Sequence, residues 1–132
     1  MYKFSKRSLE RMEGIDEKLV IIAHRALSIS KIDFGIPEFG GLRNSDQQKK
    51  LFDLGKSKVD GTEVKSKHQY GKALDVFAYV DGNASWDIEY MAQIAAAFLQ
   101  ASNSLGYNII WGGLWENFID TPHFELVGKW QN

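Results

Sequence analysis

A histidine and an aspartate seven residues apart, His68 and Asp75, lie in the segment SKHQYGKALDV with a glycine between them. An α-helix would leave the two side chains about 10 Å apart along its axis, and a straight strand would point them to opposite faces. A bend at Gly71, which tolerates positive φ, would fold His68 back over the start of a strand that carries Asp75. An imidazole and a carboxylate that converge in this way are two of the three protein ligands of a catalytic zinc site.

The third ligand has few candidates, because the chain has three histidines and no cysteine. His24 lies in the segment Leu9–Leu27, where apolar residues recur at helical spacing, and this favours a structural role on an amphipathic helix. His123 differs because it begins the short apolar segment 123–127, which is typical of a strand. Asp120, three residues before His123, would place near the metal a carboxylate that does not bind it, as a general base requires.

Two motifs combine these residues. The pattern S-x-H-x-x-G-x-A-x-D is filled by Ser66, His68, Gly71, Ala73 and Asp75, and D-x-x-H-F-E by Asp120, His123, Phe124 and Glu125. The two motifs resemble those of the LAS group of zinc peptidases, which includes D-Ala-D-Ala peptidases of the VanX and VanY types. The likeness is greatest to phage endolysins that are L-alanyl-D-glutamate endopeptidases. The resemblance covers most of the chain, and it implies a zinc ion held by His68, Asp75 and His123 with Asp120 as the base. Two separated motifs that agree in order and distance make the signal specific.

A third segment, GGLRNSDQQKKLF at residues 40–52, is similar to the part of these enzymes that carries an arginine and a glutamine ahead of the zinc motif. The resemblance implies that Arg43 faces the oxyanion that develops during hydrolysis. One departure concerns Leu114, because several relatives carry an aspartate at the corresponding position. We therefore expect no polar contact to substrate from this residue.

Candidate substrate contacts are Ser66, Gln47 and Trp115. Hydrogen bonds that cap a helix or close a turn would explain the first two equally well. Trp115 lies in a glycine-rich loop beside the predicted base, where aromatic side chains often line a groove. The other aromatic residues near this region are expected to pack in the core, namely Trp111, Phe118 and Trp130.

Composition predicts one compact domain over residues 1–132. The chain has 132 residues, 44% of them hydrophobic, and no proline-rich or glycine-rich linker that would divide it, so we expect no separate cell-wall-binding domain. Neither a charge-free signal peptide nor a run of 18 apolar residues is present, which predicts no membrane insertion. We expect a monomer made in the host cytoplasm that acts on the cell wall after release.

Charge is unevenly distributed along the chain. The segment Lys49–Lys72 holds seven lysines against three acidic residues, in a chain with a formal net charge of -1. A basic rim near the predicted site would attract the carboxylates of peptidoglycan stem peptides, although lysines also serve as a solvated surface. Binding to nucleic acid is not expected, because arginines are few and the aromatic residues do not alternate with the lysines.

The elements that must position these residues follow from periodicity and turn signals. Helices are predicted at 9–29, at 45–54 with Ser45 as N-cap, and at 86–105 with Gly106 ending the last one. Strands are predicted at 73–80, 107–111 and 123–127, with a turn at 81–85 and the last two strands paired. This order favours an α+β domain in which about three helices pack on a small antiparallel sheet that carries the zinc site, as in hedgehog and D-Ala-D-Ala peptidase domains.

The predicted function is that of an endolysin, a zinc-dependent peptidoglycan hydrolase that cleaves the L-Ala-D-Glu bond of stem peptides. A D-alanyl-D-alanine carboxypeptidase or dipeptidase on the same scaffold is one alternative, and it would need a cationic group for the terminal carboxylate. A non-catalytic zinc-binding module is the other alternative. The presence of Asp120 argues against that module, because a purely structural metal site has no use for an uncoordinated base.

Overall fold

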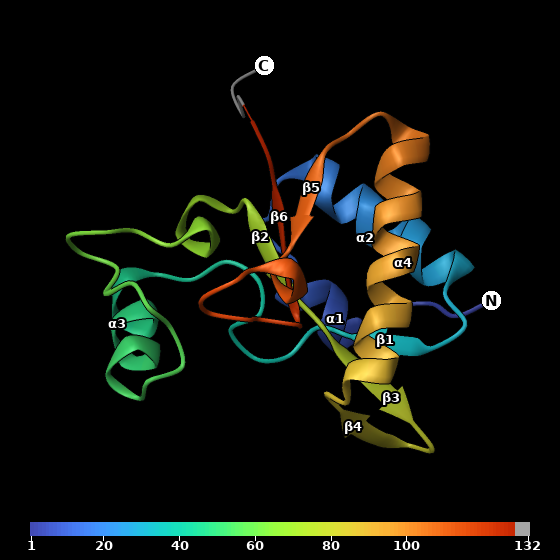
Figure 1. Ribbon diagram of the computed structural model, residues 1–132, viewed down its shortest axis with the longest axis horizontal. Coiled ribbons are helices and arrows are strands. Elements are labelled where there is room, and N and C mark those ends of the chain that lie inside the picture. Colours follow the sequence, from blue (N-terminus) through green and yellow to red (C-terminus); the bar gives the residue numbers. More distant parts are fainter. Residues whose placement is uncertain (129–132) are drawn as a thin grey trace.

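The computed structural model describes residues 1–128, which form four α-helices and two three-stranded antiparallel sheets (Figure 1). The helices are α1 (Lys6–Arg11), α2 (Glu17–Ile29), α3 (Ser45–Asp53) and α4 (Ile88–Leu105), and the short 3₁₀ helices are η1 (Lys67–Tyr70) and η2 (Gly112–Leu114). One sheet has the order β1-β3-β4, with β1 (Asp33–Gly35), β3 (Phe77–Val80) and β4 (Asn83–Ser85). The other has the order β2-β6-β5, with β2 (Ala73–Asp75), β6 (His123–Leu126) and β5 (Ile109–Trp111). The predicted α+β class is confirmed.

The first predicted helix is two helices, which raises their number from about three to four. The chain leaves α1 and turns at Gly14, where φ is 83°. Asp16 then caps α2, because its carboxylate accepts a hydrogen bond from the N–H of Lys18 at 2.8 Å. The apolar spacing continues across this break, so periodicity alone could not locate it.

The predicted strand 73–80 is divided between the two sheets. Val76 lies between β2 and β3, and its N–H donates to the carbonyl of Pro122 at 3.0 Å. The predicted turn 81–85 is shorter, because only Asp81 and Gly82 adopt positive φ, as in a tight hairpin, and β4 follows at once. β1 has no counterpart among the predicted strands.

Two helix ends can be compared with their predictions. The N-cap of α3 is Asn44 and not Ser45, because the Asn44 side chain accepts from the N–H of Gln47 at 2.8 Å. Gly106 ends α4 with φ of 78°, as predicted. The predicted pairing of the last two strands is also confirmed, with Ile109 opposite Leu126.

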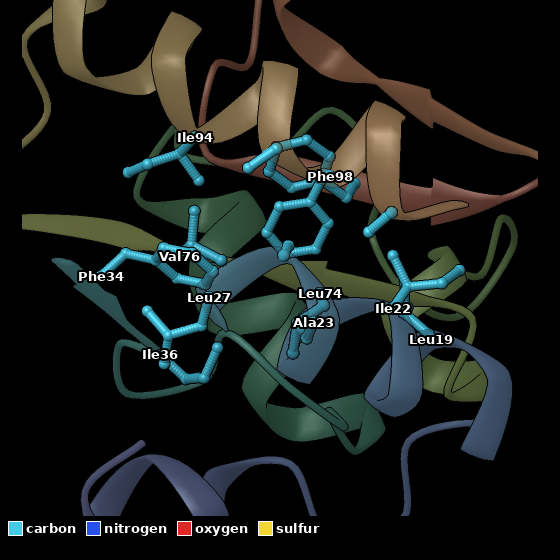
Figure 2. Close-up of a cluster of buried hydrophobic side chains, with 14 of the residues drawn as sticks. Leu19, Ile22, Ala23, Leu27, Phe34, Ile36, Leu74, Val76, Ile94 and Phe98 are labelled. Atoms are coloured by element: carbon cyan, nitrogen blue, oxygen red, sulfur yellow. The ribbon is translucent and has the colours of Figure 1, made fainter. Parts of the chain in front are cut away.

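The hydrophobic core lies between helices α2 and α4 and the inner faces of the sheets (Figures 1 and 2). Phe98 of α4 stacks on Phe124 of β6 with ring centroids 4.0 Å apart and meets Phe34 of β1 at 5.5 Å. Leu74 of β2 and Val76 are fully buried in the same cluster. Leu74 and Val76 are the neighbours of Asp75 in the sequence, so their burial in the core holds the chain in place on both sides of Asp75.

The β2-β6 pair separates core residues from polar ones. Leu74 lies opposite Phe124, and both are buried in the core. The next pair along, Asp75 opposite His123, points to the other face because side chains alternate along a strand. A slip of β2 by one residue would turn Asp75 to the other face while His123 stayed in place, so burial of Leu74 and Phe124 also aligns Asp75 with His123.

Asp16 ties the start of α2 to the segment before β2, and we expect Asp16→Ala to lower the free energy of unfolding by about 2–3 kcal/mol. The substitution removes the cap of α2, worth about 1 kcal/mol, and a partly buried charged hydrogen bond of comparable or greater strength. That second bond joins Asp16 Oδ2 to Lys72 Nζ at 2.5 Å. Denaturant unfolding measures the effect.

Asp53→Ala is the matched control, because the Asp53 carboxylate forms an exposed pair with Lys49 and is expected to contribute less than about 0.5 kcal/mol to the free energy of unfolding.

The stabilisation by Asp16 depends on pH. Burial alone would raise the pKa of Asp16, but Lys72 and the N–H of Lys18 outweigh it and lower the pKa from 3.8. The stabilisation is therefore present above this value and lost as the pH falls below it. Equal effects of the two substitutions at neutral pH would contradict the assignment.

Candidate metal centre

The structure brings together the three residues predicted as metal ligands. His68, Asp75 and His123 each offer one ligand atom, and these atoms all lie within 4.8 Å of one another. Asp75 Oδ1 is 3.3 Å from both His68 Nε2 and His123 Nδ1, and the two nitrogens are also 3.3 Å apart. Both imidazoles are buried. The three atoms thus surround a single point.

Two local features produce this convergence. The β2-β6 register places Asp75 directly opposite His123. His68 reaches the same point from η1, which ends at Gly71 with φ of 71° before the chain enters β2. A side chain at Gly71 would also place its Cβ 2.7 Å from the carbonyl oxygen of Gly14. The bend expected between His68 and Asp75 is therefore present, at the expected glycine.

The outer nitrogens of both imidazoles face hydrogen-bond acceptors. His68 Nδ1 lies 3.0 Å from the carbonyl oxygen of Gly41, and His123 Nε2 lies 2.8 Å from Glu125 Oε1. A carbonyl oxygen and a carboxylate only accept, so the ring proton of each neutral imidazole lies on its outer nitrogen. His68 Nε2 and His123 Nδ1 then turn lone pairs towards Asp75.

Asp75 completes a group of atoms suited to a cation. Its Oδ2 accepts a hydrogen bond from Arg43 NH2 at 3.0 Å, whereas its Oδ1 is buried and receives no hydrogen bond within residues 1–128. When both imidazoles are neutral, as metal ligands must be, an unsatisfied buried oxygen beside their two lone pairs is unfavourable unless a cation lies between them. Two nitrogens and one oxygen match the ligand atoms of a catalytic zinc site. Each of the three side chains also forms a hydrogen bond on the side away from these atoms, as the ligands of such sites do.

The pKa values show how strongly the three groups interact in the metal-free chain. Burial opposes the charge of Asp75, but the adjacent imidazoles outweigh it and hold the pKa of Asp75 well below its usual range. Burial lowers the pKa of His68. Burial also acts to lower the pKa of His123, but Asp75 and Glu125 raise it to about 9. A metal ion must therefore displace a proton from His123 at neutral pH.

Asp120, the predicted base, lies beside the ligands without joining them. Its Oδ2 is 3.8 Å from His123 Nδ1, and 28% of its side chain is exposed. Burial and the charge of Asp75 raise the pKa of Asp120 to about 6, although His123 and Arg43 act against this increase. A carboxylate with such a pKa is suited to both accept and release a proton near neutral pH.

Arg43 contacts a predicted ligand. Its NH2 group donates to Asp75, its NH1 group to Gln48 Oε1 at 3.1 Å, and its Nε to the carbonyl of Phe39 at 2.7 Å. These bonds occupy three of the five N–H groups of a guanidinium. Arg43 therefore holds Asp75 in place, and the contact with an oxyanion stays a prediction for its remaining donors.

The predicted substrate contacts occupy different environments. The Trp115 ring lies 5.0 Å from that of His123, so it borders the centre. The N–H of Ser66 donates to Gln69 Oε1 at 2.9 Å at the start of η1. Gln47 is part of the capping box of α3, in which its Oε1 accepts from the N–H of Asn44. Contact of these three with substrate stays a prediction, and Leu114 is 73% exposed.

The remaining histidine and the other aromatic residues can also be placed. His24 is exposed on α2, where its ring meets Phe4 edge-on at 5.1 Å. Trp111 packs against the core and donates from Nε1 to the carbonyl of Thr121 at 2.6 Å. Phe118 is only half-buried and lies under the ammonium of Lys58 at 5.5 Å. Trp130 lies outside the described residues.

Sequence reasoning missed the backbone that holds the ligands, which is the segment 39–43. The carbonyl of Gly40 accepts from the N–H of Asp75 at 2.7 Å, and that of Gly41 accepts from His68. A Cβ at Gly41 would lie 1.9 Å from the carbonyl oxygen of Arg11, so only glycine fits this position. The doublet Gly40-Gly41 was the available signal, because adjacent glycines often mark close backbone approach. Glu125 was also missed as the partner of His123.

Three converging ligand atoms beside an uncoordinated carboxylate form the arrangement of a single-metal hydrolase. A model of the family described as phage L-alanyl-D-glutamate peptidase matches residues 1–127, and the chain belongs to this family. The resemblance stated from the two motifs is confirmed, as is the assignment to the peptidases.

Individual relatives agree with the family assignment. The chain is 33% identical to the L-alanyl-D-glutamate peptidase of Escherichia phage T5 over 96% of its own length and 98% of that protein. It is 31% identical to the peptidoglycan L-alanyl-D-glutamate endopeptidase CwlK of Bacillus subtilis, over 73% of this chain and 62% of CwlK. Among solved structures, the L-Ala D-Glu endopeptidase ChiX of Serratia marcescens superposes with a TM-score of 0.83 and 35% identity, covering 95% of this chain and 90% of ChiX. Within residues 1–128, no helix is both long enough and apolar enough to cross a membrane.

Proposed function

We propose that this chain is an endolysin that uses zinc to hydrolyse the bond between L-alanine and D-glutamate in peptidoglycan stem peptides. The observation that carries the proposal is the buried Asp75 Oδ1, which receives no hydrogen bond from residues 1–128 and lies 3.3 Å from His68 Nε2 and from His123 Nδ1, beside Asp120. Membership of the L-alanyl-D-glutamate peptidase family supports the choice of bond. The name of the CwlK relative supports peptidoglycan as the substrate.

Zinc is the metal that this donor set favours. Imidazole nitrogens exclude the cations that prefer oxygen alone, and three protein ligands leave a position open, as in catalytic zinc sites. A zinc ion bound here would polarise the scissile carbonyl and lower the pKa of a coordinated water to about 7. His68, Asp75 and His123 would hold it, and their second hydrogen bonds to Gly41, Arg43 and Glu125 keep the ligand atoms aimed at one point.

The protein side chains would supply the proton transfers. Asp120 takes a proton from the attacking water as the water oxygen bonds to the carbonyl carbon, and it delivers that proton to the leaving nitrogen as the C–N bond breaks. The free N–H groups of Arg43 would donate to the oxygen that gains negative charge. Trp115, beside His123, would border the bound peptide. We assign the base to Asp120 and not to Glu125, because the Glu125 carboxylate lies 2.8 Å from Nε2, the outer nitrogen of His123.

The proposal extends to the oligomeric state of the chain, its domain organisation and its location in the cell. We propose that the chain acts as a monomeric single domain, is made in the host cytoplasm and reaches the wall after release. Lysines of the segment 49–72 would form a basic rim for the acidic stem peptide. Lys65, for example, lies over the ring of Tyr70, which follows His68 in η1.

Mass spectrometry of purified muropeptides after digestion tests the function directly. A product with a new N-terminal D-glutamate is the expected result. Loss of a terminal D-alanine instead would identify a carboxypeptidase or dipeptidase. Unchanged muropeptides with a zinc-loaded chain would identify a non-catalytic zinc-binding module.

The role of Asp120 predicts that activity falls on the acidic side of neutrality. The carboxylate must be ionised to accept a proton, and its pKa in the metal-free chain is about 6. A bound cation favours the carboxylate form, so the midpoint of the acidic limb of kcat is expected at or below this value. Below the midpoint, kcat falls about tenfold per pH unit.

The profile is measured with a soluble muropeptide across acidic and neutral pH. Zinc content determined at each pH separates titration of the base from loss of the metal, because the ligands also take up protons in acid. A midpoint above neutral pH, with zinc still bound, would identify a different group as the base.

A further inference from the structure

Gln48 is a polar side chain of α3 that is entirely buried, with 0% of its surface exposed. Both ends of its amide are used. Its Nε2 donates to Ser57 Oγ and to the carbonyl oxygen of Val59, each at 2.8 Å. Its Oε1 accepts from Arg43 NH1 at 3.1 Å. Such a fully bonded amide is costly to disturb, because each lost partner leaves a buried polar atom unsatisfied.

The bonds to Ser57 and Val59 fix which way the amide faces. A glutamine amide has two N–H bonds, and both are directed at the segment 57–59. Rotating the amide by half a turn would aim N–H groups at the Arg43 guanidinium, which also only donates. The carbonyl oxygen must therefore face Arg43.

Arg43 carries this constraint to the metal centre. The guanidinium is planar, so fixing NH1 on Gln48 and Nε on the carbonyl of Phe39 also fixes the position of NH2. NH2 is the group that donates to Asp75 Oδ2 at 3.0 Å. Holding Oδ2 leaves Oδ1 turned towards His68 and His123.

We propose that Gln48 is a positioning residue for the metal centre, acting through Arg43 to orient the ligand carboxylate of Asp75. The proposal rests on the proposed zinc function. It also couples the segment 57–59, which supplies no ligand, to the geometry of the site. Residues that orient a ligand from behind typically change metal affinity 10-fold to 100-fold when they are removed, and Gln48 acts one residue further out.

Gln48→Met tests this role, because methionine fills a similar volume and forms none of the three hydrogen bonds. We expect the zinc affinity, measured by competition with a chelator, to fall about tenfold. Gln93→Met on the exposed side of α4 is the control and is expected to leave the affinity within about twofold of the parent. Thermal unfolding of the metal-free chains identifies any variant that does not fold. Should Gln48→Met be such a variant, Gln48→Asn, which withdraws the amide by one methylene, takes its place.

A double-mutant cycle distinguishes positioning through Arg43 from a general loosening of the fold. In an Arg43→Ala background the guanidinium is absent, so Gln48→Met is expected to change zinc affinity by less than about twofold. The same tenfold loss in both backgrounds would mean that Gln48 acts on the fold alone and would overturn the proposal. Unchanged affinity of Gln48→Met in the parent background would also overturn it while leaving the proposed zinc function intact. A parent chain that binds no zinc would overturn both.

Discussion

Alanine variants of His68 and His123 are expected to fold, to carry no stoichiometric zinc and to hydrolyse peptidoglycan at least about 10³-fold more slowly than the parent. Each substitution leaves two protein ligands, and a three-ligand site rarely retains its metal on two. The rate follows, because a catalytic metal contributes several kcal/mol of transition-state stabilisation and each 1.4 kcal/mol is about tenfold in rate. Metal analysis after dialysis and release of soluble muropeptides measure the two effects.

His24→Ala is the matched control, since it removes the one histidine that lies outside the group. This variant is expected to keep both zinc and activity. If His68→Ala and His123→Ala each retained one zinc per chain, the ligand assignment would be wrong. Loss of zinc from His24→Ala would contradict the structural role of that residue on α2.

The sequence could predict the convergence of the ligands because local rules determine it. Gly71 supplies the bend that brings His68 back towards β2. Alternation along β2 and β6 then places Asp75 and His123 on the face opposite Leu74 and Phe124, once the apolar pair is buried. Each step depends on glycine geometry or strand periodicity, which can be read from residue types alone.

Other features depend on contacts between distant segments, so the sequence could not predict them. The carbonyls of Gly40 and Gly41 hold Asp75 and His68 only because the segment 39–43 packs against η1 and β2. The doublet Gly40-Gly41 indicates close backbone approach, but it does not show which groups will donate to these carbonyls. The break between α1 and α2 is similar, since the apolar spacing continues through it and only the cap at Asp16 marks the new helix. Strand 73–80 was predicted as one element because its hydrophobic run does not show that Val76 changes partner.

The two carboxylates around His123 illustrate how geometry separates residues that are alike in sequence. Glu125 lies 2.8 Å from Nε2, the outer nitrogen, whereas Asp120 lies 3.8 Å from Nδ1, the nitrogen that faces the other ligands. Of the two carboxylates, Asp120 is therefore the one on the side of His123 that faces the other predicted ligands. Glu125 instead determines which nitrogen of His123 carries the ring proton.

Asp120→Asn is expected to bind zinc with the affinity of the parent, to unfold at a similar temperature and to hydrolyse muropeptides about 10²-fold to 10⁴-fold more slowly. The amide has almost the same size as the carboxylate but cannot accept the proton of the attacking water, and the three ligands are unchanged. Kinetics with a soluble muropeptide should show the loss mainly in kcat, because the missing interaction operates in the transition state.

Asp33→Asn is the matched control. Burial also raises the pKa of Asp33, but this residue lies on β1, outside the metal-ligand group, so the activity of the variant should equal that of the parent. Activity of Asp120→Asn within a few-fold of the parent would show that another group is the base. Bound zinc without cleavage by either chain would instead favour the non-catalytic zinc-binding module.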